Sequence, residues 1–417
     1  VTYAWNTAGA IAGSLAGGFG LLPILTAPGA WVAVVLLLSA LCAASLVHSA
    51  RGRLGWGLLP PALTAGLAVL LVAFSEGPTA VWRHSGIGAG RATIDRSSPN
   101  ATRAWVHSVR RDTIWEAEGV EASVAINVGD GLSFYVNGKA DGNAVGDVGT
   151  QVMLGVLPAL LHPDPSTAMV VGMGTGETAG WLAETPGMQR VDVVELEHAI
   201  DDVARRCALA NHDVMRHPKV RRIYNDAREV LLTTPERYDI ISSEPSNPYR
   251  AGIAGLFTRE FYLAARNRLR DRGLFVQWLQ GYEVDDRTVR IVFATLSSVF
   301  PHIEVWQSKQ DDMLLVCSTS PMSYDGDRLH AKLAHDSYRE AVAVAWRAVD
   351  LEGIAARFIA DSEFVRDYGA REAGAENTDS RNRIEYMFAR SLGRSTDFSI
   401  EELRRLAAAD GRDQPPT

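Results

Sequence analysis

The sequence contains few cysteines, and they form no pattern. Its three cysteines are Cys42, Cys207 and Cys317, which lie far apart with no CxxC pair and no cluster with histidine. A disulfide framework needs several paired cysteines and a zinc site needs clustered ligands, so neither is expected. We predict no bound metal, and a reducing compartment is the default.

Positive charge is also scarce. The chain has 41 Lys and Arg residues against 49 Asp and Glu residues, a formal net charge of -8, and no long basic run. Because nucleic-acid binding depends on basic side chains that neutralise phosphates, a general nucleic-acid binder is not expected. The acidic balance suits a cationic small substrate, although most mildly acidic proteins are acidic only for solubility.

The signatures of several common chemistries are missing as well. The sequence has no GxSxG nucleophile elbow, no HExxH zinc motif and no histidine clustered with acids. These absences argue against a serine hydrolase and against a zinc hydrolase. The length of 417 residues exceeds one ordinary core and indicates two or three structural units.

Long hydrophobic stretches are present, but only at the start of the chain. Three stretches, residues 5–25, 31–47 and 58–74, contain no charged side chain. Each is close to the roughly 20 residues that cross a bilayer as a helix. We therefore predict about three transmembrane helices in residues 1–75 and a multi-pass membrane protein in contact with the lipid bilayer.

The charged residues near these stretches bear on which side of the membrane the rest of the chain occupies. Arg51 and Arg53 favour a cytoplasmic link between the second and third stretches, which would put the following domain outside. Arg83, Arg91 and Arg96 nearly balance that signal. The ligand that the motifs below indicate leads us to place the domain that follows in the cytoplasm.

The remaining sequence divides into four regions by pattern. Residues 76–120 form a connecting region, and residues 121–150 form a β-hairpin region with strands in 122–128 and 132–138 around Gly129-Asp130-Gly131. Residues 151–324 alternate apolar strands with helices, which predicts an α/β domain with a parallel sheet and helices on both faces. Residues 325–417 read as amphipathic helices, with a disordered polar tail over 410–417.

A glycine-rich turn is the first feature that indicates chemistry. Gly172, Gly174 and Gly176 follow an apolar run at residues 168–171, and a helix is expected after them. Glycines let a backbone turn sharply and approach a ligand closely. Because no Lys-Ser or Lys-Thr pair follows and the spacing is not GxGxxG, an adenosyl group is favoured over a phosphate loop or a dinucleotide.

Two acids at the ends of the next strands extend this site. Glu195 ends the strand 191–194, about twenty residues beyond the glycines, where a carboxylate can accept both ribose hydroxyls. Asp226 follows the run 220–223 and can accept the adenine amino group. Each acid alone could be a surface residue at a strand end, but the three elements together predict a pocket for S-adenosylmethionine or its decarboxylated form.

Glu244 is the candidate catalytic residue. It lies in the segment Ser242-Ser-Glu-Pro-Ser-Asn-Pro248, after a strand at residues 240–241. An amine must lose a proton before it attacks a sulfonium carbon, and a carboxylate can accept that proton. The alternative interpretation is a structural turn with a solvated glutamate.

In this order, the motifs VVELE, NDAREVL and YDIISSEPSNP resemble those of the polyamine aminopropyltransferases, the spermidine synthase family. The resemblance covers roughly residues 120–320 and is greatest to membrane-fused spermidine synthase-like proteins, which Asn377-Thr-Asp379 also fits. It implies a Rossmann-like S-adenosylmethionine-dependent transferase fold, no metal and a homodimer. It further implies a ribose site at Glu195, an adenine site at Asp226 and Ala227, and Glu244 in place of the family's catalytic Asp.

Three positions depart from the family pattern. Thr175 stands where the glycine turn of the family usually has Asp, Asn247 stands where the catalytic loop has its second Asp, and Gln151 replaces a Tyr of the amine site. Thr175 remains a candidate cofactor-binding residue, and Gln151, Asn247 and Tyr249 remain candidates for the amine site. The loss of two negative charges should weaken the binding of a dicationic substrate by a few kcal/mol in a dry site.

Three functions therefore stay open. The first is a spermidine synthase-like aminopropyltransferase that uses decarboxylated S-adenosylmethionine and an amine acceptor and releases methylthioadenosine. The second is an enzyme that uses intact S-adenosylmethionine for methyl transfer or an intramolecular reaction. The third is a non-catalytic membrane sensor that binds the cofactor or polyamines.

Overall fold

The computed structural model describes residues 2–50, 59–74, 81–87, 92–129, 131–248, 252–372, 374, 376–391 and 398–416. The chain divides into two compact units. The N-terminal unit contains Val1–Gly129 and Tyr135–Lys139, and the α/β unit contains Asp130–Phe134 and Ala140–Thr417.

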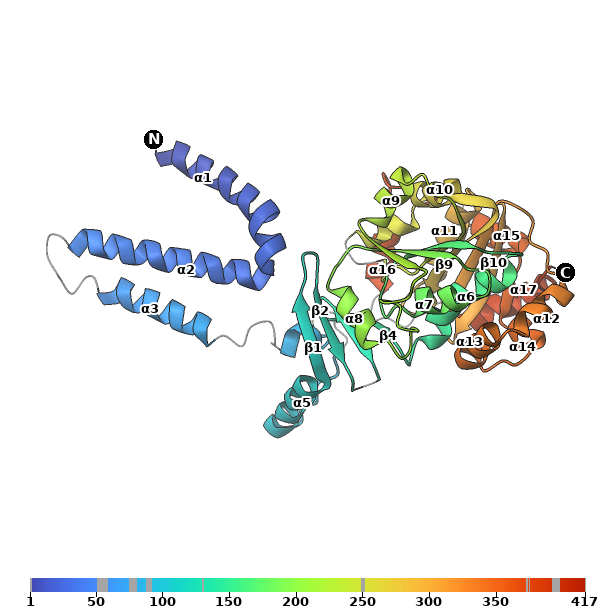
Figure 1. Cartoon of the computed structure of the whole chain (residues 1–417), viewed down its shortest axis with the longest axis horizontal. Helices are drawn as coiled ribbons and strands as arrows, with labels where there is room; N and C mark the ends of the chain where they lie inside the picture. Colours follow the sequence, from blue (N-terminus) through green and yellow to red (C-terminus); the bar gives the residue numbers. More distant parts are fainter. Residues whose placement is uncertain are drawn as a thin grey trace. The chain divides into compact units, whose positions relative to one another are not determined.

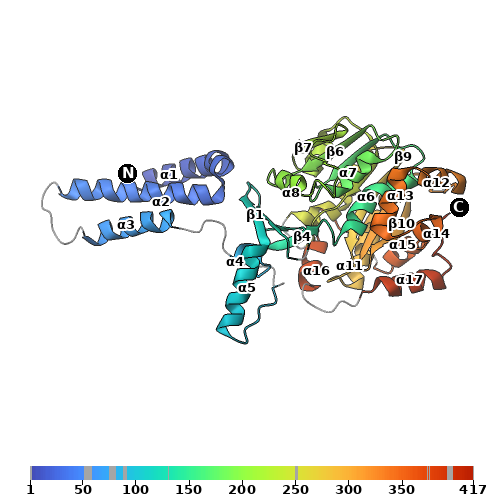
Figure 2. The ribbon, with the colours of Figure 1, turned by 60° about the horizontal axis from the view of Figure 1, so that its bottom comes forward.

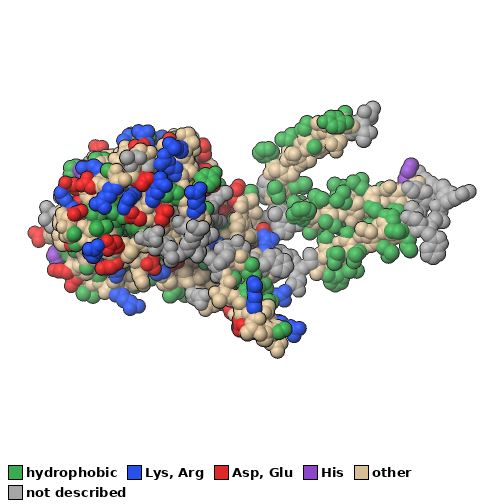
Figure 3. Space-filling view, turned by 180° about the vertical axis from the view of Figure 1, so that it is seen from behind, with side chains coloured by type: hydrophobic (Ala, Val, Ile, Leu, Met, Phe, Trp, Pro, Cys, Tyr) green, Lys and Arg blue, Asp and Glu red, His purple; other side chains and the backbone are tan. Residues whose placement is uncertain are grey.

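The N-terminal unit begins with three apolar helices. They are α1 (Thr2–Ala16), which continues through a π-helical turn at Gly17–Leu21, then α2 (Leu22–Ala50) and α3 (Leu59–Ala73). Helices α2 and α3 pack against each other (Figure 1). Their large apolar side chains remain exposed, and Figure 3 shows hydrophobic side chains over the surface of these helices, whereas charged side chains gather on the surface of the α/β unit.

Only one of these helices is long and apolar enough to cross a bilayer, among the residues that the structure describes. It is the segment Gly29–His48 of α2, with 20 residues, a mean hydropathy of 2.5 and no buried residue in that window. Helices α1 and α3 have 15 residues each, about 22 Å of α-helix, which is shorter than the hydrocarbon core of about 30 Å. The prediction of about three transmembrane helices is therefore corrected to one candidate. A signal sequence near an N-terminus has the same length and composition as this candidate.

The predicted connecting region contains more regular structure than the sequence indicated. It includes α4 (Val81–His84), α5 (Pro99–Asp112) and strand β1 (Thr113–Glu118). Helix α5 begins where the Ser98 side chain accepts a hydrogen bond from the backbone N–H of Ala101, with Pro99 in the first turn. This helix is polar overall and none of its described residues is buried, which explains why it was not predicted.

The predicted hairpin strands lie in a four-stranded sheet with the order β1-β2-β3-β4. Strands β2 (Ser123–Asn127) and β3 (Ser133–Val136) are neighbours in that sheet, as the sequence predicted, although Asp130 of the intervening turn is outside the described residues. Strand β1 pairs antiparallel with β2. The fourth strand is β4 (Lys139–Asn143), which the sequence did not indicate.

The α/β unit is built on an eight-stranded sheet with the order β12-β10-β11-β9-β8-β5-β6-β7. Its strands are β5 (Thr167–Val171), β6 (Arg190–Glu195), β7 (Val220–Tyr224), β8 (Tyr238–Ser243), β9 (Leu269–Gln280), β10 (His302–Lys309), β11 (Asp312–Ser318) and β12 (Phe358–Ala360). Strands β5 to β9 pair in parallel, whereas β10, β11 and β12 pair antiparallel with their neighbours. The sheet is therefore mixed, which corrects the prediction of a parallel sheet; only two residues join β10 to β11, and such a short link permits only antiparallel pairing.

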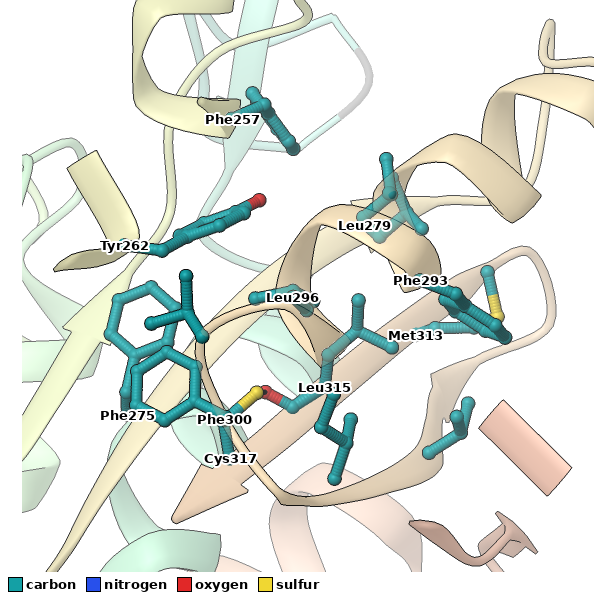
Figure 4. Packing of buried hydrophobic residues seen from close by; sticks show 14 of the residues in the cluster. Phe257, Tyr262, Phe275, Leu279, Phe293, Leu296, Phe300, Met313, Leu315 and Cys317 are labelled. Carbon is teal, nitrogen blue, oxygen red and sulfur yellow. Dashed lines mark hydrogen bonds between the residues drawn. The ribbon is translucent and has the colours of Figure 1, made fainter. Parts of the chain in front are cut away.

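Helices cover both faces of this sheet, as predicted (Figure 2). Helices α6 (Val148–Leu161), α7 (Glu177–Glu184) and α13 (Asp336–Trp346) pack together on one face. The other face carries α9 (Ala227–Thr233), α10 (Arg259–Asn267), α11 (Asp286–Ser297) and α15 (Ser362–Ala370). The main hydrophobic core lies under this second set, where Phe275 of β9 stacks on Phe300 with a ring-centroid distance of 5.5 Å (Figure 4).

The C-terminal region is mostly helical, as predicted, with α12 (Gly326–Leu333), α14 (Leu351–Ala355), α16 (Ile384–Ser391) and α17 (Ile400–Ala409) besides α13 and α15. It also supplies the edge strand β12, which the sequence did not indicate. The prediction of a disordered tail was wrong for residues 410–416. The Pro416 carbonyl accepts from the Tyr324 N–H at 3.1 Å, and the Arg412 carbonyl accepts from the Asp361 N–H at 3.0 Å.

Candidate active site

The glycine turn joins β5 to α7, as the sequence predicted. Gly172, Gly174 and Gly176 have φ values of +91°, +49° and +82°, a region of backbone conformation that favours glycine. At Gly176 a side chain is excluded by space as well, because a Cβ atom would lie 2.6 Å from a methyl carbon of Val214. The turn therefore depends on its glycines and presents bare backbone at the carboxyl end of β5.

Glu195 lies at the end of β6 and is bound to this turn. Its Oε2 accepts from the Met173 N–H at 2.9 Å, and its Oε1 accepts from the N–H groups of Leu196 and Glu197 at 2.8 and 2.9 Å. Burial raises the pKa of Glu195, and the three backbone hydrogen bonds oppose that shift. Backbone donors thus fix the carboxylate in place, and Oε2, which accepts only one of the three hydrogen bonds, keeps a lone pair for a hydroxyl group of a ligand.

Asp226 lies at the end of the neighbouring strand β7. It is the N-cap of α9, where its Oδ1 accepts from the Arg228 N–H at 2.7 Å, and it is exposed. The preceding residue donates its N–H to the Glu195 carbonyl at 3.1 Å, which joins the two strand ends. Leu196, 53% exposed beside Glu195, adds an apolar surface that the sequence reasoning missed. Ala227 is buried at the start of α9.

Asp226 is also connected to the C-terminal region. The Arg228 guanidinium donates to the Gly255 carbonyl at 3.1 Å and forms a short ion pair with Asp379. Asn377 is fully buried, and its side chain donates to the Phe257 carbonyl at 3.1 Å and accepts from the Arg383 N–H at 2.7 Å. The Asn377-Thr-Asp379 motif therefore supports the α9 side of the site.

Glu244 follows β8 and lies beside α7. Its backbone N–H points to the Val171 carbonyl at 3.4 Å, and its Oε2 lies 3.1 Å from the Thr178 hydroxyl. Thr178 also lies 2.8 Å from the Gln151 carbonyl, and a hydroxyl has only one proton to donate. If that proton goes to the α6 carbonyl, Thr178 can accept a hydrogen bond from a protonated Glu244.

The protonation of Glu244 is shifted toward neutral pH. Burial and the charges of Asp147, Asp312 and Asp141 raise its pKa to about 8, and the Thr178 hydrogen bond opposes the shift. A carboxylate with a pKa near the working pH can accept and release a proton efficiently. This property fits the predicted role of Glu244 as a proton acceptor better than that of a solvated turn residue.

The three positions that depart from the family pattern form neutral hydrogen-bonded pairs. The Thr175 hydroxyl donates to Gln151 Oε1 in a short contact, so two of these positions contact each other. The Asn247 amide donates to Gln280 Oε1, also in a short contact, and Gln280 donates to the Tyr282 carbonyl at 2.7 Å. Thr175, Gln151 and Asn247 are all buried. Tyr249 lies outside the described residues.

Acidic residues that the sequence reasoning missed surround this site. Asp147 binds the Lys309 ammonium at 2.8 Å, Asp141 accepts from the Ser246 hydroxyl at 2.6 Å, and Asp312 accepts from the Thr150 hydroxyl at 3.0 Å. Burial raises the pKa of Asp312 to about 6. Asp141 lies in β4, Asp147 directly precedes α6 and Asp312 begins β11. All three are outside every recognisable motif, so no local signal could have identified them.

Metal ligation was considered for the same residues. Within the part of the chain that the structure describes, no group of three or more His, Cys, Asp or Glu side chains could hold a metal ion.

Comparison with known proteins assigns this region to a family. Residues 148–309 match the family model of the spermine/spermidine synthase domain, from the first residue of α6 to the last residue of β10. These residues therefore contain a spermine/spermidine synthase domain. The matched domain contains the glycine turn, Glu195, Asp226 and Glu244, whereas β1 to β4 and the C-terminal helices lie outside it.

Individual relatives agree with this family. The chain is 28% identical over 155 residues to a polyamine aminopropyltransferase from Alkaliphilus metalliredigens, which covers 37% of this chain and 54% of the relative. It is 27% identical over 171 residues to the Lachnospira eligens enzyme of the same name, which covers 40% of this chain and 57% of the relative. The chain thus spans about half the length of the curated relatives it matches.

Solved spermidine synthases share the fold. The spermidine synthase from Thermotoga maritima superposes with a TM-score of 0.50 at 18% identity, covering 62% of this chain and 88% of that chain. A spermidine synthase in complex with the transition state analogue AdoDATO gives the same TM-score and identity, covering 62% of this chain and 89% of that chain. At this identity the similarity describes the architecture alone.

Proposed function

We propose that this protein transfers an aminopropyl group from decarboxylated S-adenosylmethionine to an amine acceptor. The observation that carries the proposal is the position of Glu244, a half-buried carboxylate with a raised pKa, at the strand end beside the turn that holds Glu195. The names of the matched relatives support the same activity. A spermidine synthase with a similar fold binds a transition state analogue of its reaction, which supports an adenosyl ligand at this edge of the sheet.

The adenosyl group would bind along three strand ends. Glu195 would accept the ribose hydroxyls, and Asp226 would accept the adenine amino group. Leu196 and Ala227 would contact the flat faces of the base. The glycine turn would let the sulfonium side chain pass close to the backbone, next to Thr175.

The reaction then needs one proton acceptor and correct alignment. The acceptor ammonium gives a proton to the charged form of Glu244, and the freed lone pair attacks the aminopropyl carbon bonded to sulfur. The carbon–sulfur bond breaks and its electrons stay on sulfur, so the sulfonium becomes the neutral thioether of methylthioadenosine. Holding the two reactants in line would provide most of the rate gain, with a further contribution from the proton transfer.

The acceptor site would be less negative than the family pattern implies. Gln151, Thr175 and Asn247 form neutral pairs, while Asp141, Asp147 and Asp312 still contribute negative charge. This composition favours a cationic amine but not specifically a diamine such as putrescine. Gln151 and Asn247, with Tyr249, are the residues that we propose line the acceptor site.

A product assay tests this function. The chain should convert decarboxylated S-adenosylmethionine and one member of an amine panel into methylthioadenosine and a longer amine. Formation of S-adenosylhomocysteine as the main product would support use of the intact cofactor instead. Tight cofactor binding without any product would support a sensor.

The Glu244→Gln variant sharpens the assay. We expect its turnover to fall by about 10²- to 10⁴-fold, the range for loss of a general base, with nearly unchanged affinity for the donor. Wild-type rates in this variant would remove Glu244 from the mechanism. The matched control is Glu363→Gln, an exposed carboxylate of α15 outside the site, which should keep the wild-type rate.

We further propose that helix α2 inserts into a bilayer through Gly29–His48 and that the α/β unit lies in the cytoplasm, where its donor would be made. The apolar, unburied surface of this segment supports insertion. Carbonate extraction of membranes would test it, because an inserted chain stays in the pellet. Protease protection of sealed vesicles would report the side of the α/β unit.

Assembly as a homodimer is also a proposal, which rests on the family resemblance alone. Light scattering of the purified chain would give the mass of the assembly directly.

A further inference from the structure

Glu177 is a buried carboxylate for which the proposed mechanism has no role. It is the first residue of α7, directly after the glycine turn, and it is only 1% exposed. Neither of its carboxylate oxygens has a hydrogen-bond partner in the described part of the chain. A buried unpaired carboxylate costs several kcal/mol, so natural proteins rarely keep one without a ligand or a function.

Asp192, another buried acid of the same unit, has partners for both carboxylate oxygens. Asp192 is fully buried, and it accepts from the Arg221 guanidinium at 2.7 and 2.8 Å and from the Tyr238 hydroxyl at 2.8 Å. The fold therefore can pair a buried carboxylate where the acid is structural. Among the described residues Glu177 has no such partner, which indicates that a group able to stabilise its charged form would come from outside the chain.

The position of Glu177 suggests which ligand group it would meet. On one side, the Met173 N–H of the turn holds Glu195, the proposed ribose acid. On the other side, the hydroxyl of Thr178, the next residue, reaches Glu244, the proposed proton acceptor. Glu177 therefore belongs to the stretch of backbone between the ribose end and the reacting end of the site, the stretch that the donor side chain would follow.

The charges around Glu177 come from several elements and are negative. Glu244 after β8 and Asp147 before α6 both add to the effect of burial, and together they raise the pKa of Glu177 to about 9. The Cys207 thiol follows α8 (Ile200–Arg206), and burial together with the charge of Glu177 raises the pKa of this thiol to about 12. A cation would be strongly favoured in this environment, and an additional carboxylate would be repelled.

We propose that Glu177 binds the primary ammonium of the donor's aminopropyl group and thereby selects decarboxylated over intact S-adenosylmethionine. This inference rests on the proposed function. The family usually has an Asp where this chain has Thr175. In this proposal the negative charge is supplied two residues later, by Glu177 at the first position of α7. Intact S-adenosylmethionine would bring its own carboxylate toward Glu177 and Glu244, and that repulsion disfavours it.

Proton release gives a readout that does not depend on turnover. Because Glu177 is protonated at neutral pH in the free protein, binding of an ammonium should displace its proton. Calorimetry of the chain of residues 1–417 in detergent, at about pH 7.5 in two buffers of different ionisation enthalpy, counts the released protons. Decarboxylated S-adenosylmethionine should release more protons than methylthioadenosine, which lacks the ammonium.

The Glu177→Gln variant should remove this difference. We expect its dissociation constant for decarboxylated S-adenosylmethionine to rise by about tenfold or more, the loss of one charge-assisted hydrogen bond, with unchanged affinity for methylthioadenosine. Its preference for the decarboxylated over the intact donor should shrink. Glu184→Gln at the exposed end of the same helix is the matched control and should bind all three ligands like the wild type.

The possible outcomes are distinct. Equal weakening of methylthioadenosine and of the decarboxylated donor would show that Glu177 only shapes the turn, and unchanged donor affinity would overturn the proposal directly. Should Glu177→Gln not fold, Glu177→Asp carries the same test, since a shortened carboxylate should weaken the donor more than methylthioadenosine. A wild-type chain that binds none of the three ligands would refute the proposed function rather than the role of Glu177.

Discussion

The two units of this protein place polar and apolar side chains in opposite ways. In α2 of the N-terminal unit, Leu36, Leu37 and Leu38 are 46%, 59% and 59% exposed, and the segment Gly29–His48 contains no charged Asp, Glu, Lys or Arg side chain. In the α/β unit, Glu177 is 1% exposed and its carboxylate has no hydrogen-bond partner among the residues that the structure describes. Water favours the reverse arrangement in both cases.

An exposed apolar side chain or a buried unpaired carboxylate can indicate which kind of partner a region binds. Exposed leucines without charge are stable next to hydrocarbon, and a buried unpaired carboxylate is stable next to a cation. Asp192, with its arginine and tyrosine partners, shows that the α/β unit follows the ordinary rule elsewhere. The two exceptions are the observations behind the proposals of a lipid contact for one unit and of an ammonium ligand for the other.

The largest effect is expected in the N-terminal unit, where a charge in the apolar helix tests whether its exposed leucines contact lipid. The substitution Leu37→Arg places a charge near the middle of the Gly29–His48 segment, at a cost of about 2.5 to 3.5 kcal/mol for insertion. We expect the variant to leave the membrane pellet after carbonate extraction, while Leu37→Ile stays in it. If Leu37→Arg remains in the pellet as well, this segment does not anchor the chain.

A pH series of stability tests the α/β unit with a smaller effect. The folded pKa of Glu177, about 9, lies above the ordinary value of 4.5, so its contribution is fully present below about pH 4.5 and is lost as the pH rises toward 9. Glu177→Gln should therefore become more stable relative to the wild type as the pH increases over this range. Urea unfolding at several pH values measures the difference, and a constant difference would mean that Glu177 does not titrate with folding.

The smallest expected effect concerns the support of the adenine side. Asp379→Asn removes the charge that pairs with Arg228, a partly exposed ion pair worth at most about 1 kcal/mol. We expect donor affinity to fall by no more than about fivefold, with the rate at saturating donor unchanged. A large loss of that rate would show that this ion pair controls the reacting end of the site as well.

Sequence reasoning placed the glycine turn and the two strand-end acids correctly in the fold because their signals are local. A strand followed by Gly172, Gly174 and Gly176 has few structural solutions, and Glu195 and Asp226 each follow directly from the strand that carries them. The parallel pairing of β5, β6 and β7 then brings these strand ends to one edge. Their predicted contacts with a ligand stay a prediction.

The missed features depend on contacts between distant residues. The pairing of Thr175 with Gln151 and of Asn247 with Gln280 joins residues from different elements, so each looked like an isolated loss of charge in the sequence. Glu177 stood next to the glycine turn, but its lack of a partner became visible only from its surroundings in three dimensions. The antiparallel strands β10 to β12 were missed because short apolar runs do not reveal strand direction.

The buried Asn377 shows that the folded α/β unit extends beyond the domain that the family model recognises. The recognisable family domain ends at residue 309, yet Asn377 lies beyond it and holds the Phe257 carbonyl beneath the site, while β12 pairs with β10 at the sheet edge. A fragment cut at the limits of the family domain would leave the Phe257 carbonyl without the hydrogen bond from Asn377 and would expose the edge of β10. Any attempt to isolate the α/β unit should therefore keep the chain through residue 416, where the last described backbone contact is made.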